Sequence, residues 1–166
     1  MVRPILPSDA PELADAIRTA DSATLHTRFL GSPPPITDAL LDKLTQVDYV
    51  SQFALVAFAR GRGVAIARYI ALPATEDGAI PAEVAVVVAP KWRRVGLATA
   101  LLQMLVRRAD ECGITHFTAL FLAENRPVVE LARTGNAKVA IARGMAQVEA
   151  PLASRAETVS DGTTIG

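Results

Sequence analysis

The stretch PKWRRVGLATALL (residues 90–102) joins a run of valines to a segment rich in alanine and leucine. The valine run predicts a strand and the segment after Gly96 predicts a helix, so Arg93 and Arg94 fall in the turn between them. The first N–H groups of a helix have no partner within it and carry partial positive charge. Because glycine has no Cβ, a large ligand can approach the backbone closely at Gly96. These features together predict a site for phosphate, and particularly for a diphosphate.

This turn differs from the common glycine-rich phosphate loops. It lacks the lysine followed by serine or threonine of a Walker A loop, and it holds one glycine where G-x-G-x-x-G has three. The alternative is a basic turn that contacts solvent alone, and the local sequence leaves both possibilities open. The formal net charge of the chain is zero, so any anion site must be local.

The elements around the turn predict a central sheet. Residues 83–89 (EVAVVVA) form a nearly continuous apolar strand, which is typical of a strand covered on both faces. A helix from Gly96 to Gly113 has an apolar stripe at Leu97, Leu101 and Leu105, and a strand follows at 114–122. This strand–helix–strand unit should be parallel and right-handed. The remaining predicted elements are an edge strand at 2–6, helices starting at Ser8 or Asp9 and at Thr37, strands at 53–59 and 63–72 joined by the turn RGRG, a short helix at 124–133, and strands at 137–142 and 144–150.

The composition of the chain is that of one globular domain. Its 166 residues are 51% hydrophobic and 20% charged, which excludes general disorder. We expect one domain over residues 1–150 and a loose tail over 151–166, where large apolar residues are few. The neutral net charge disfavours nucleic acid as a partner, no segment approaches the roughly 18 apolar residues that cross a membrane, and no metal-ligand spacing is present. A lone cysteine and the lack of a secretory signal predict a cytoplasmic protein, either a monomer or a homodimer.

The segment from Arg93 to Ala98 (RRVGLA) resembles the R/Q-x-x-G-x-G/A signature of the GCN5-related N-acetyltransferases (GNAT). Five blocks in order resemble, more narrowly, the acetyltransferase domain of bacterial Pat-type protein lysine acetyltransferases. They are HTRFLG (26–31), LTQVDY (44–49), ARYIAL (67–72), AEVAVVVAPKWRRVGLATALL (82–102) and LAENRPVVELAR (122–133). The resemblance covers about residues 3–148 and implies an α/β (α+β) fold, in which a central mixed β-sheet is flanked by helices on both faces.

The resemblance implies acetyl-CoA as cosubstrate. It assigns the pyrophosphate to backbone N–H groups of the turn, and the adenosine 3′-phosphate to one of three cations, Lys91, Arg93 or Arg94. It also implies that backbone groups of Val87 and Val88 bind the pantetheine arm and the thioester carbonyl, and that Asn125 contacts the CoA arm. The alternatives are an ordinary core role for the valines and a helix N-cap role for the asparagine. The residues of the predicted pyrophosphate site are Arg94, Val95, Gly96, Leu97 and Ala98.

Glu83 is the candidate general base. A lysine amine has a pKa of about 10.4 and is protonated at neutral pH, so a base must remove its proton before it attacks a thioester. Glu83 opens the central strand and shares a face with Ala85 and Val87, close to the expected thioester. Partial burial beside these apolar neighbours would make its carboxylate a better base. Its position also coincides with the catalytic glutamate of the lysine acetyltransferases that the chain resembles, although a glutamate at a strand end is more often simply solvated.

The N-terminal half of the chain forms the acceptor side if the resemblance holds, and the implied acceptor is a protein lysine. Asp48 would attract a cationic lysine, or else cap a loop. His26 would line the acceptor pocket, although a lone histidine is more often structural or exposed. The candidate acceptor-binding residues are His26, Arg28, Phe29, Asp48 and Tyr49.

One departure from the family pattern keeps other functions open. Many relatives carry a tyrosine in the helix after the asparagine, placed to protonate the leaving thiolate, and NRPVVELARTGNAK has none. Water or another donor must then serve, or the thiolate leaves unaided. The alternatives to a protein lysine acetyltransferase are an enzyme that acetylates a small-molecule amine and a CoA-binding sensor or interaction module with weak catalysis.

Overall fold

A seven-stranded mixed sheet with the strand order β1-β2-β3-β4-β5-β7-β6 forms the centre of the molecule. The computed structural model describes residues 1–30, 32–134 and 137–152. Strands β1 (Val2–Pro4), β2 (Gln52–Ala59), β3 (Arg62–Ala71) and β4 (Pro81–Val88) pair in antiparallel fashion. β1 is an edge strand, as the proline at its end predicts. The RGRG segment makes the predicted tight turn between β2 and β3, with positive φ at Arg60 and Gly61.

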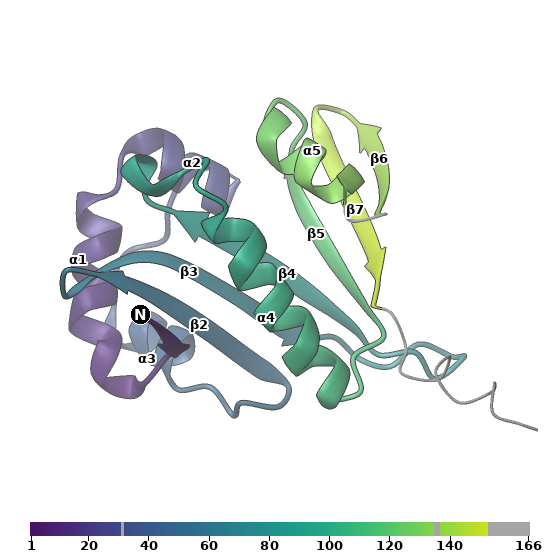
Figure 1. Ribbon diagram of the computed structural model, residues 1–166, viewed down its shortest axis with the longest axis horizontal. Coiled ribbons are helices and arrows are strands. Elements are labelled where there is room, and N and C mark those ends of the chain that lie inside the picture. Colours follow the sequence, from purple (N-terminus) through teal and green to yellow (C-terminus); the bar gives the residue numbers. More distant parts are fainter. Residues whose placement is uncertain (31, 135–136, 153–166) are drawn as a thin grey trace, which may run out of the picture.

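The two halves of the sheet, β1–β4 and β5–β7, are joined by a short pairing between β4 and β5. β5 (His116–Leu122) is parallel to β4, as the strand–helix–strand pattern predicts, but the two strands pair over Pro81–Glu83 and His116–Thr118 alone. Beyond these residues β4 and β5 diverge (Figure 1). β5 then pairs along its whole length with β7 (Met145–Pro151), and β6 (Lys138–Ala142) forms the other edge. We call the region beyond Glu83 the β4–β5 divergence.

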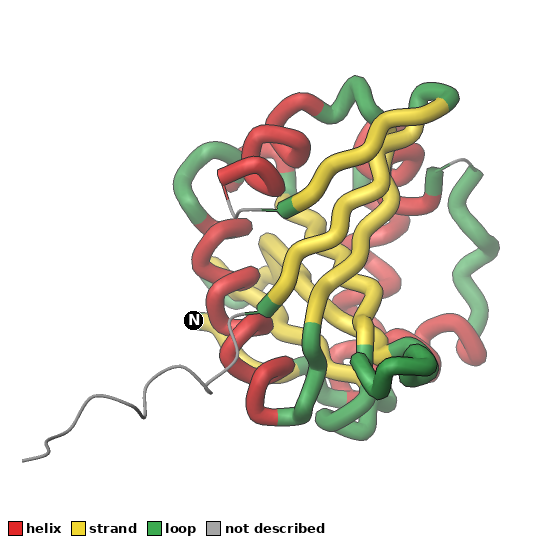
Figure 2. Tube along the Cα trace, turned by 90° about the vertical axis from the view of Figure 1, so that its right-hand side faces the viewer, coloured by secondary structure: helices red, strands yellow, loops and turns green. Residues whose placement is uncertain are grey.

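Helices cover both faces of this sheet, which confirms the predicted fold class. α4 (Leu97–Glu111) and α5 (Arg126–Thr134) lie on one face. α1 (Ala10–Thr19), α2 (Ser22–Phe29) and α3 (Asp38–Thr45) lie on the other. Figure 2, viewed from the β6 edge, shows the helices on the two sides of the strands. Among the described residues, no helix is long and apolar enough to span a membrane.

The alternation of side chains along the strands builds a core on each face of the sheet. On the α4 face, Ala67 and Tyr69 of β3 pack with Leu101 and Leu105 of α4, and all four are fully buried. The leucine stripe predicted for this helix therefore faces the core. On the opposite face a second cluster contains Ile5, Val47, Ala54 and Val56. A third cluster lies on the α5 side of β5 and β7 and contains Phe121, Val129, Ala146 and Val148.

The sequence prediction omitted one helix, α2. Ala20 has an extended backbone that ends α1, and Asp21 then starts α2 by accepting a hydrogen bond from the Thr24 N–H at 2.8 Å. The predicted cap of the following helix is correct, because Thr37 Oγ1 accepts from the Leu40 N–H at 3.2 Å. The predicted tail begins at residue 151, within the end of β7, and its residues 153–166 lie outside the described part of the chain.

Candidate functional site

The turn between β4 and α4 carries a series of backbone N–H groups without acceptors. Arg94 and Gly96 both have left-handed backbones, with φ values of 60° and 79°. Gly96 occupies the N-cap of α4 without a side-chain cap, and the first hydrogen bond of the helix joins the Ala100 N–H to the Gly96 carbonyl. Within the described chain, the N–H groups of residues 94–99 donate to no protein atom. Free N–H groups at the start of a helix, where left-handed residues alternate with right-handed ones, are typical of an anion-binding site.

Arg93 holds this turn against its neighbours. Its Nε donates to the Val88 carbonyl at 3.0 Å, and its Nη2 donates to Thr24 Oγ1 at 2.7 Å. Hydrogen bonds from Thr24 hold the pKa of Asp21 below its usual value, and the charge of Arg93 adds to this effect. Arg93 therefore ties the turn to both β4 and α2. The other two candidate cations of the turn, Lys91 and Arg94, are exposed and have no ionic partner among the described residues.

The backbone of β4 directs alternate residues to opposite sides. The Ala89 N–H donates to the Val64 carbonyl at 2.9 Å, so odd-numbered residues of β4 face β3 and even-numbered residues face β5. Val86 and Val88 lie beyond the pairing with β5, and their backbone groups therefore face the β4–β5 divergence. The backbone of Val87 faces β3 instead. The register therefore gives Val86, which the sequence did not single out, the outward-facing backbone groups that were expected of Val87.

Glu83 is exposed, whereas the sequence predicted partial burial. The cause is the divergence, because the pairing of Glu83 with Thr118 is the last between β4 and β5. The expected alternation is correct: the valines at 84, 86 and 88 pack on the α4 face, which places Glu83, Ala85 and Val87 on the face of α2. The carboxylate therefore lies where the parallel strands separate, on the side of α2.

α2 contacts both β4 and β5 and carries three of the predicted acceptor residues, His26, Arg28 and Phe29. Arg28 and Phe29 are half-buried, with the Arg28 guanidinium 5.3 Å from the Phe29 ring centre, and His26 is exposed. Burial lowers the pKa of Arg28, and the charge of Glu83 acts in the opposite direction. Arg68 of β3 shows the same two effects: burial lowers its pKa and the charge of Glu83 raises it. The sequence offered no reason to select this residue, because a single arginine in an apolar strand carries no local signal.

The other two predicted acceptor residues are engaged in the loop before β2. Asp48 accepts hydrogen bonds from the Val50 and Gln52 N–H groups, which is the alternative role of a loop cap. These bonds, and first of all the one from the Ser51 hydroxyl, lower the pKa of Asp48. The Tyr49 hydroxyl donates to the Ile5 carbonyl at 2.8 Å. Acceptor binding by either side chain would compete with these bonds.

Asn125 starts α5 through its backbone. Its carbonyl accepts from the Val128 and Val129 N–H groups at 3.1 and 3.2 Å. Its side chain is half-buried and makes no hydrogen bond within the part of the chain that the structure describes. The alternative role as a side-chain cap is therefore not seen, and the amide is available to a ligand.

The described residues also contain no group of three or more His, Cys, Asp or Glu that would hold a metal ion.

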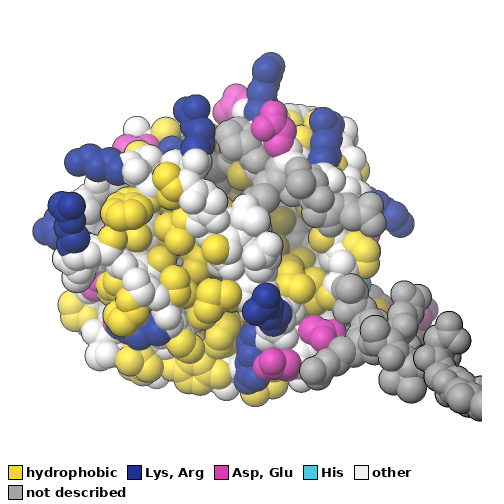
Figure 3. Space-filling view, in the orientation of Figure 1, with side chains coloured by type: hydrophobic (Ala, Val, Ile, Leu, Met, Phe, Trp, Pro, Cys, Tyr) yellow, Lys and Arg dark blue, Asp and Glu magenta, His cyan; other side chains and the backbone are white. Residues whose placement is uncertain are grey.

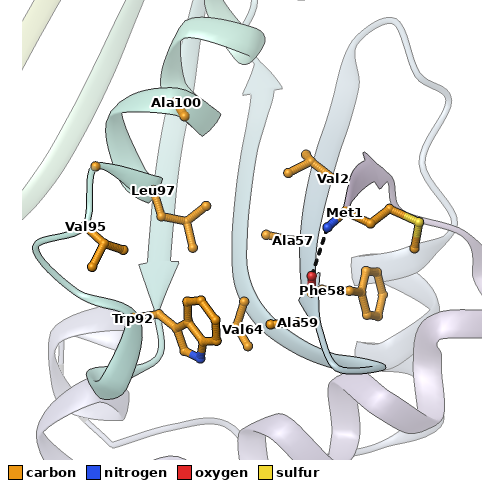
Figure 4. A pocket seen from close by; sticks show the side chains of 11 residues that line it. Met1, Val2, Ala57, Phe58, Ala59, Val64, Trp92, Val95, Leu97 and Ala100 are labelled. Carbon is orange, nitrogen blue, oxygen red and sulfur yellow. Dashed lines mark hydrogen bonds between the residues drawn. The ribbon is translucent and has the colours of Figure 1, made fainter.

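Two cavities border the turn, one on each face of the sheet. An apolar groove of about 320 Å³ lies between the start of α4 and β2–β3, where Trp92 and Leu97 point inward (Figure 4). Figure 3 shows hydrophobic side chains gathered on this face of the molecule. Val95, which also lines the groove, is 65% exposed. On the opposite face, a cavity of about 380 Å³ between α1 and the sheet is lined by Val87 and Thr24 among others. We call the latter the α1 cavity.

Sequence and structure comparisons agree on the family. The Acetyltransferase (GNAT) family model matches residues 23–135. An acetyltransferase of Pseudomonas aeruginosa is 32% identical over 135 residues, which cover 79% of this chain and 70% of the relative. The acetyltransferase Pat of Mycolicibacterium smegmatis is also 32% identical, over 126 residues that cover 75% of this chain and 37% of Pat.

Solved structures agree with this result. The crystal structure of the GNAT domain of S. lividans PAT superposes with a TM-score of 0.81 at 27% identity, over 91% of this chain and 89% of that domain. A Salmonella typhimurium protein solved with acetyl-CoA has the same fold, with a TM-score of 0.75 at 18% identity over 97% of this chain and 98% of that one. The resemblance to Pat-type domains is thereby confirmed, and the chain belongs to the acetyltransferase (GNAT) family.

Proposed function

We propose that this protein transfers acetyl from acetyl-CoA to the side-chain amine of protein lysines in the cytoplasm, with Glu83 as general base. The observation that carries the proposal is the series of unpaired N–H groups at residues 94–99, which lies where β4 ends beside its divergence from β5. A pyrophosphate supplies the acceptors that these groups lack. Family membership supports acetyl-CoA as the ligand, and a protein of the same fold was crystallised with it.

From the turn, the pantetheine arm would run along β4 within the divergence. The backbone groups of Val86 and Val88 have no strand partner there, so they are free to bind the arm and to polarise the thioester carbonyl. The Val88 carbonyl already accepts from Arg93, which leaves its N–H as the free group. This arrangement would place the thioester on β4 between the turn and Glu83.

Glu83 would accept the proton that the attacking amine must lose. Its carboxylate would take this proton directly or through one water molecule. The lysine nitrogen then forms a bond to the thioester carbon, the carbon–sulfur bond breaks, and CoA leaves as a thiolate. No tyrosine is present in α5 to protonate this thiolate, so solvent would supply the proton.

A lysine acceptor is supported by the likeness to Pat and by the α1 cavity. Val87 lines this cavity from the face that also carries Glu83. The carboxylates of Asp9 and Glu12 beside it are already bound, by Arg3 and by the Gly63 N–H, so the cavity presents mainly apolar surface. Apolar walls suit the aliphatic part of a lysine side chain.

Glu83→Gln tests the proposal. The variant keeps the size of the side chain but removes the base, so acetyl transfer should fall about 100-fold or more, while acetyl-CoA affinity stays within twofold. Glu76→Gln, in the exposed loop before β4, is the matched control and should act as wild type. Products are identified by mass spectrometry after incubation with cell-extract proteins and a panel of amines.

The outcomes separate the alternatives. If Glu83→Gln transfers acetyl as fast as wild type, Glu83 is not the base. If the acetylated products are small amines and not lysines, the acceptor assignment is wrong. If neither protein turns over but acetyl-CoA stabilises both, by about 2.7 kcal/mol at 100 times its Kd, the chain is a CoA-binding module.

A further inference from the structure

Arg68 of β3 is a buried arginine with no hydrogen bond to any residue that the structure describes. It is 5% exposed, and its Nε and Nη1 atoms are buried without a hydrogen bond to any described residue. A guanidinium stays protonated in proteins, and a buried charge is costly unless it is paired. Arg68 therefore requires acceptors that the described chain does not provide.

The position of Arg68 places it beside the candidate base. Its partner on β4 is Ala85, so it lies on the same face of the sheet as Glu83 and Val87. Arg28 reaches the same place from α2. Burial lowers the pKa of Arg68, the charge of Arg28 lowers it further, and the charge of Glu83 raises it, which indicates that the three groups are neighbours.

The charges of this cluster do not balance. Arg28 and Arg68 bring two guanidinium groups, and Glu83 is the one carboxylate among the described residues that acts on either of them. The cluster thus carries a net positive charge, although the whole chain is formally neutral. If Glu83 takes the proton of the acceptor amine, it neutralises even less of that charge during the reaction.

We propose that Arg68, assisted by Arg28, binds a carboxylate of the acceptor, close to the amine that is acetylated. This inference rests on the proposed function. An ionised carboxylate only accepts hydrogen bonds, and its two oxygens can accept from two N–H groups of one guanidinium. It also has the single negative charge that would balance the cluster. It belongs either to an aspartate or glutamate next to the acceptor lysine or to a free amino acid, and both present the same group.

The experiment compares acceptors that differ in this carboxylate. Two peptides of equal length carry one lysine flanked by glutamate or by glutamine, and free amino acids are compared with their amides. Wild type should prefer the acidic acceptors about 10- to 100-fold in kcat/KM, the range of one charge-assisted hydrogen bond. Arg68→Met should abolish this preference and leave acetyl-CoA affinity unchanged. Arg62→Met, at the exposed start of β3, should retain it.

Stability gives a second, independent measurement. If Arg68 serves the fold, Arg68→Met lowers the melting temperature and slows both peptides equally, and this result overturns the proposal. If Arg68 serves a ligand, Met removes an unpaired buried charge, and the melting temperature stays the same or rises. Should this variant fail to fold, equal rates of wild type with the two peptides and with the amino acids and their amides would refute the proposal on their own.

Binding separates this inference from the proposed function. Fluorescence anisotropy of labelled peptides on CoA-saturated protein requires no turnover. A protein that acetylates no amine but binds the acidic peptide more tightly contradicts the proposed function and supports the carboxylate site. A protein that acetylates both peptides equally and binds them equally supports the enzyme and contradicts the site. A preference for amino acids over amides, without one between peptides, identifies the acceptor as a free amino acid.

Discussion

Gly96→Ala is the substitution that best separates the ligand from the fold at the turn before α4. Gly96 has a φ of 79°, where an L-residue costs about 1–2 kcal/mol. A Cβ at this position meets no protein atom within 4 Å, so no clash adds to the strain. Alanine also restricts the unfolded chain, which offsets about 0.4–1 kcal/mol. The expected net loss is about 1 kcal/mol in the free energy of unfolding, or about 2–4 °C in melting temperature for a chain of this size.

The effect on acetyl-CoA should be larger than the effect on stability. The open space around Gly96 is where the pyrophosphate would approach the N–H groups of the turn, so a methyl group there should weaken binding at least tenfold, about the loss of one charge-assisted hydrogen bond. Gly78→Ala is the matched control. Gly78 has a φ of 84° and equally open surroundings, but it lies in the loop before β4.

The assay is calorimetric titration with acetyl-CoA, together with thermal unfolding of the free proteins. Both variants should lose similar stability, and Gly96→Ala alone should lose affinity. Equal affinity of the two variants and wild type would refute the assignment of the turn as the diphosphate site. A loss of affinity in Gly78→Ala would show that strain anywhere in the chain weakens binding, and the reasoning from local contact would fail.

Further predictions concern the charges around the site. Arg93→Gln should cost about 1 kcal/mol of stability, because two hydrogen bonds to β4 and α2 are lost, and should also weaken acetyl-CoA binding; Arg94→Gln should weaken binding alone. Urea denaturation and ligand titration distinguish the two, and equal stability losses would contradict the structural role of Arg93. Asp9→Asn should cost about 1–2 kcal/mol at pH 7, because Arg3 donates two hydrogen bonds of 2.7 Å to this carboxylate. Since the hydrogen bonds from Arg3 hold the pKa of Asp9 below its usual value, wild type loses this stability as the pH falls below about 4, and urea denaturation should show the two proteins converging there.

The sequence predicted the elements of the fold where local signals agreed. Three elements were predicted from a regular apolar pattern together with a clear start or end signal, and all three are present in the structure. They are the strand of valines, the leucine stripe of α4 and the glycine turn between β2 and β3. α2 was missed because its eight residues contain two large apolar side chains, Leu25 and Phe29, which are too few for a clear apolar period, whereas the equally long α3 has three leucines. This omission matters for function, since α2 carries Arg28 and receives the hydrogen bond of Arg93.

The site itself depends on a property that the sequence does not encode locally. β4 and β5 are each long enough to pair over most of their lengths, but they pair over three residues. Where two strands separate is set by the packing of whole layers, here by α4 and α5 under the two halves of the sheet. For this reason the exposure of Glu83 could not be predicted from alternation alone, and which valines of β4 turn their backbone groups toward β5 required the register of β4 with β3.

The two sides of the site are connected through one side chain. Arg93 donates to β4 at Val88, whose backbone faces the predicted pantetheine path, and to Thr24 at the start of α2, the helix that brings Arg28 to Glu83. The two hydrogen bonds fix the turn and α2 relative to each other. The arginine that heads the family signature therefore has a structural role that does not require contact with phosphate: it holds the predicted anion-binding turn against the helix that carries three of the predicted acceptor residues. A substitution of Thr24 that removes its hydroxyl tests this point, because it leaves every charge of the turn in place.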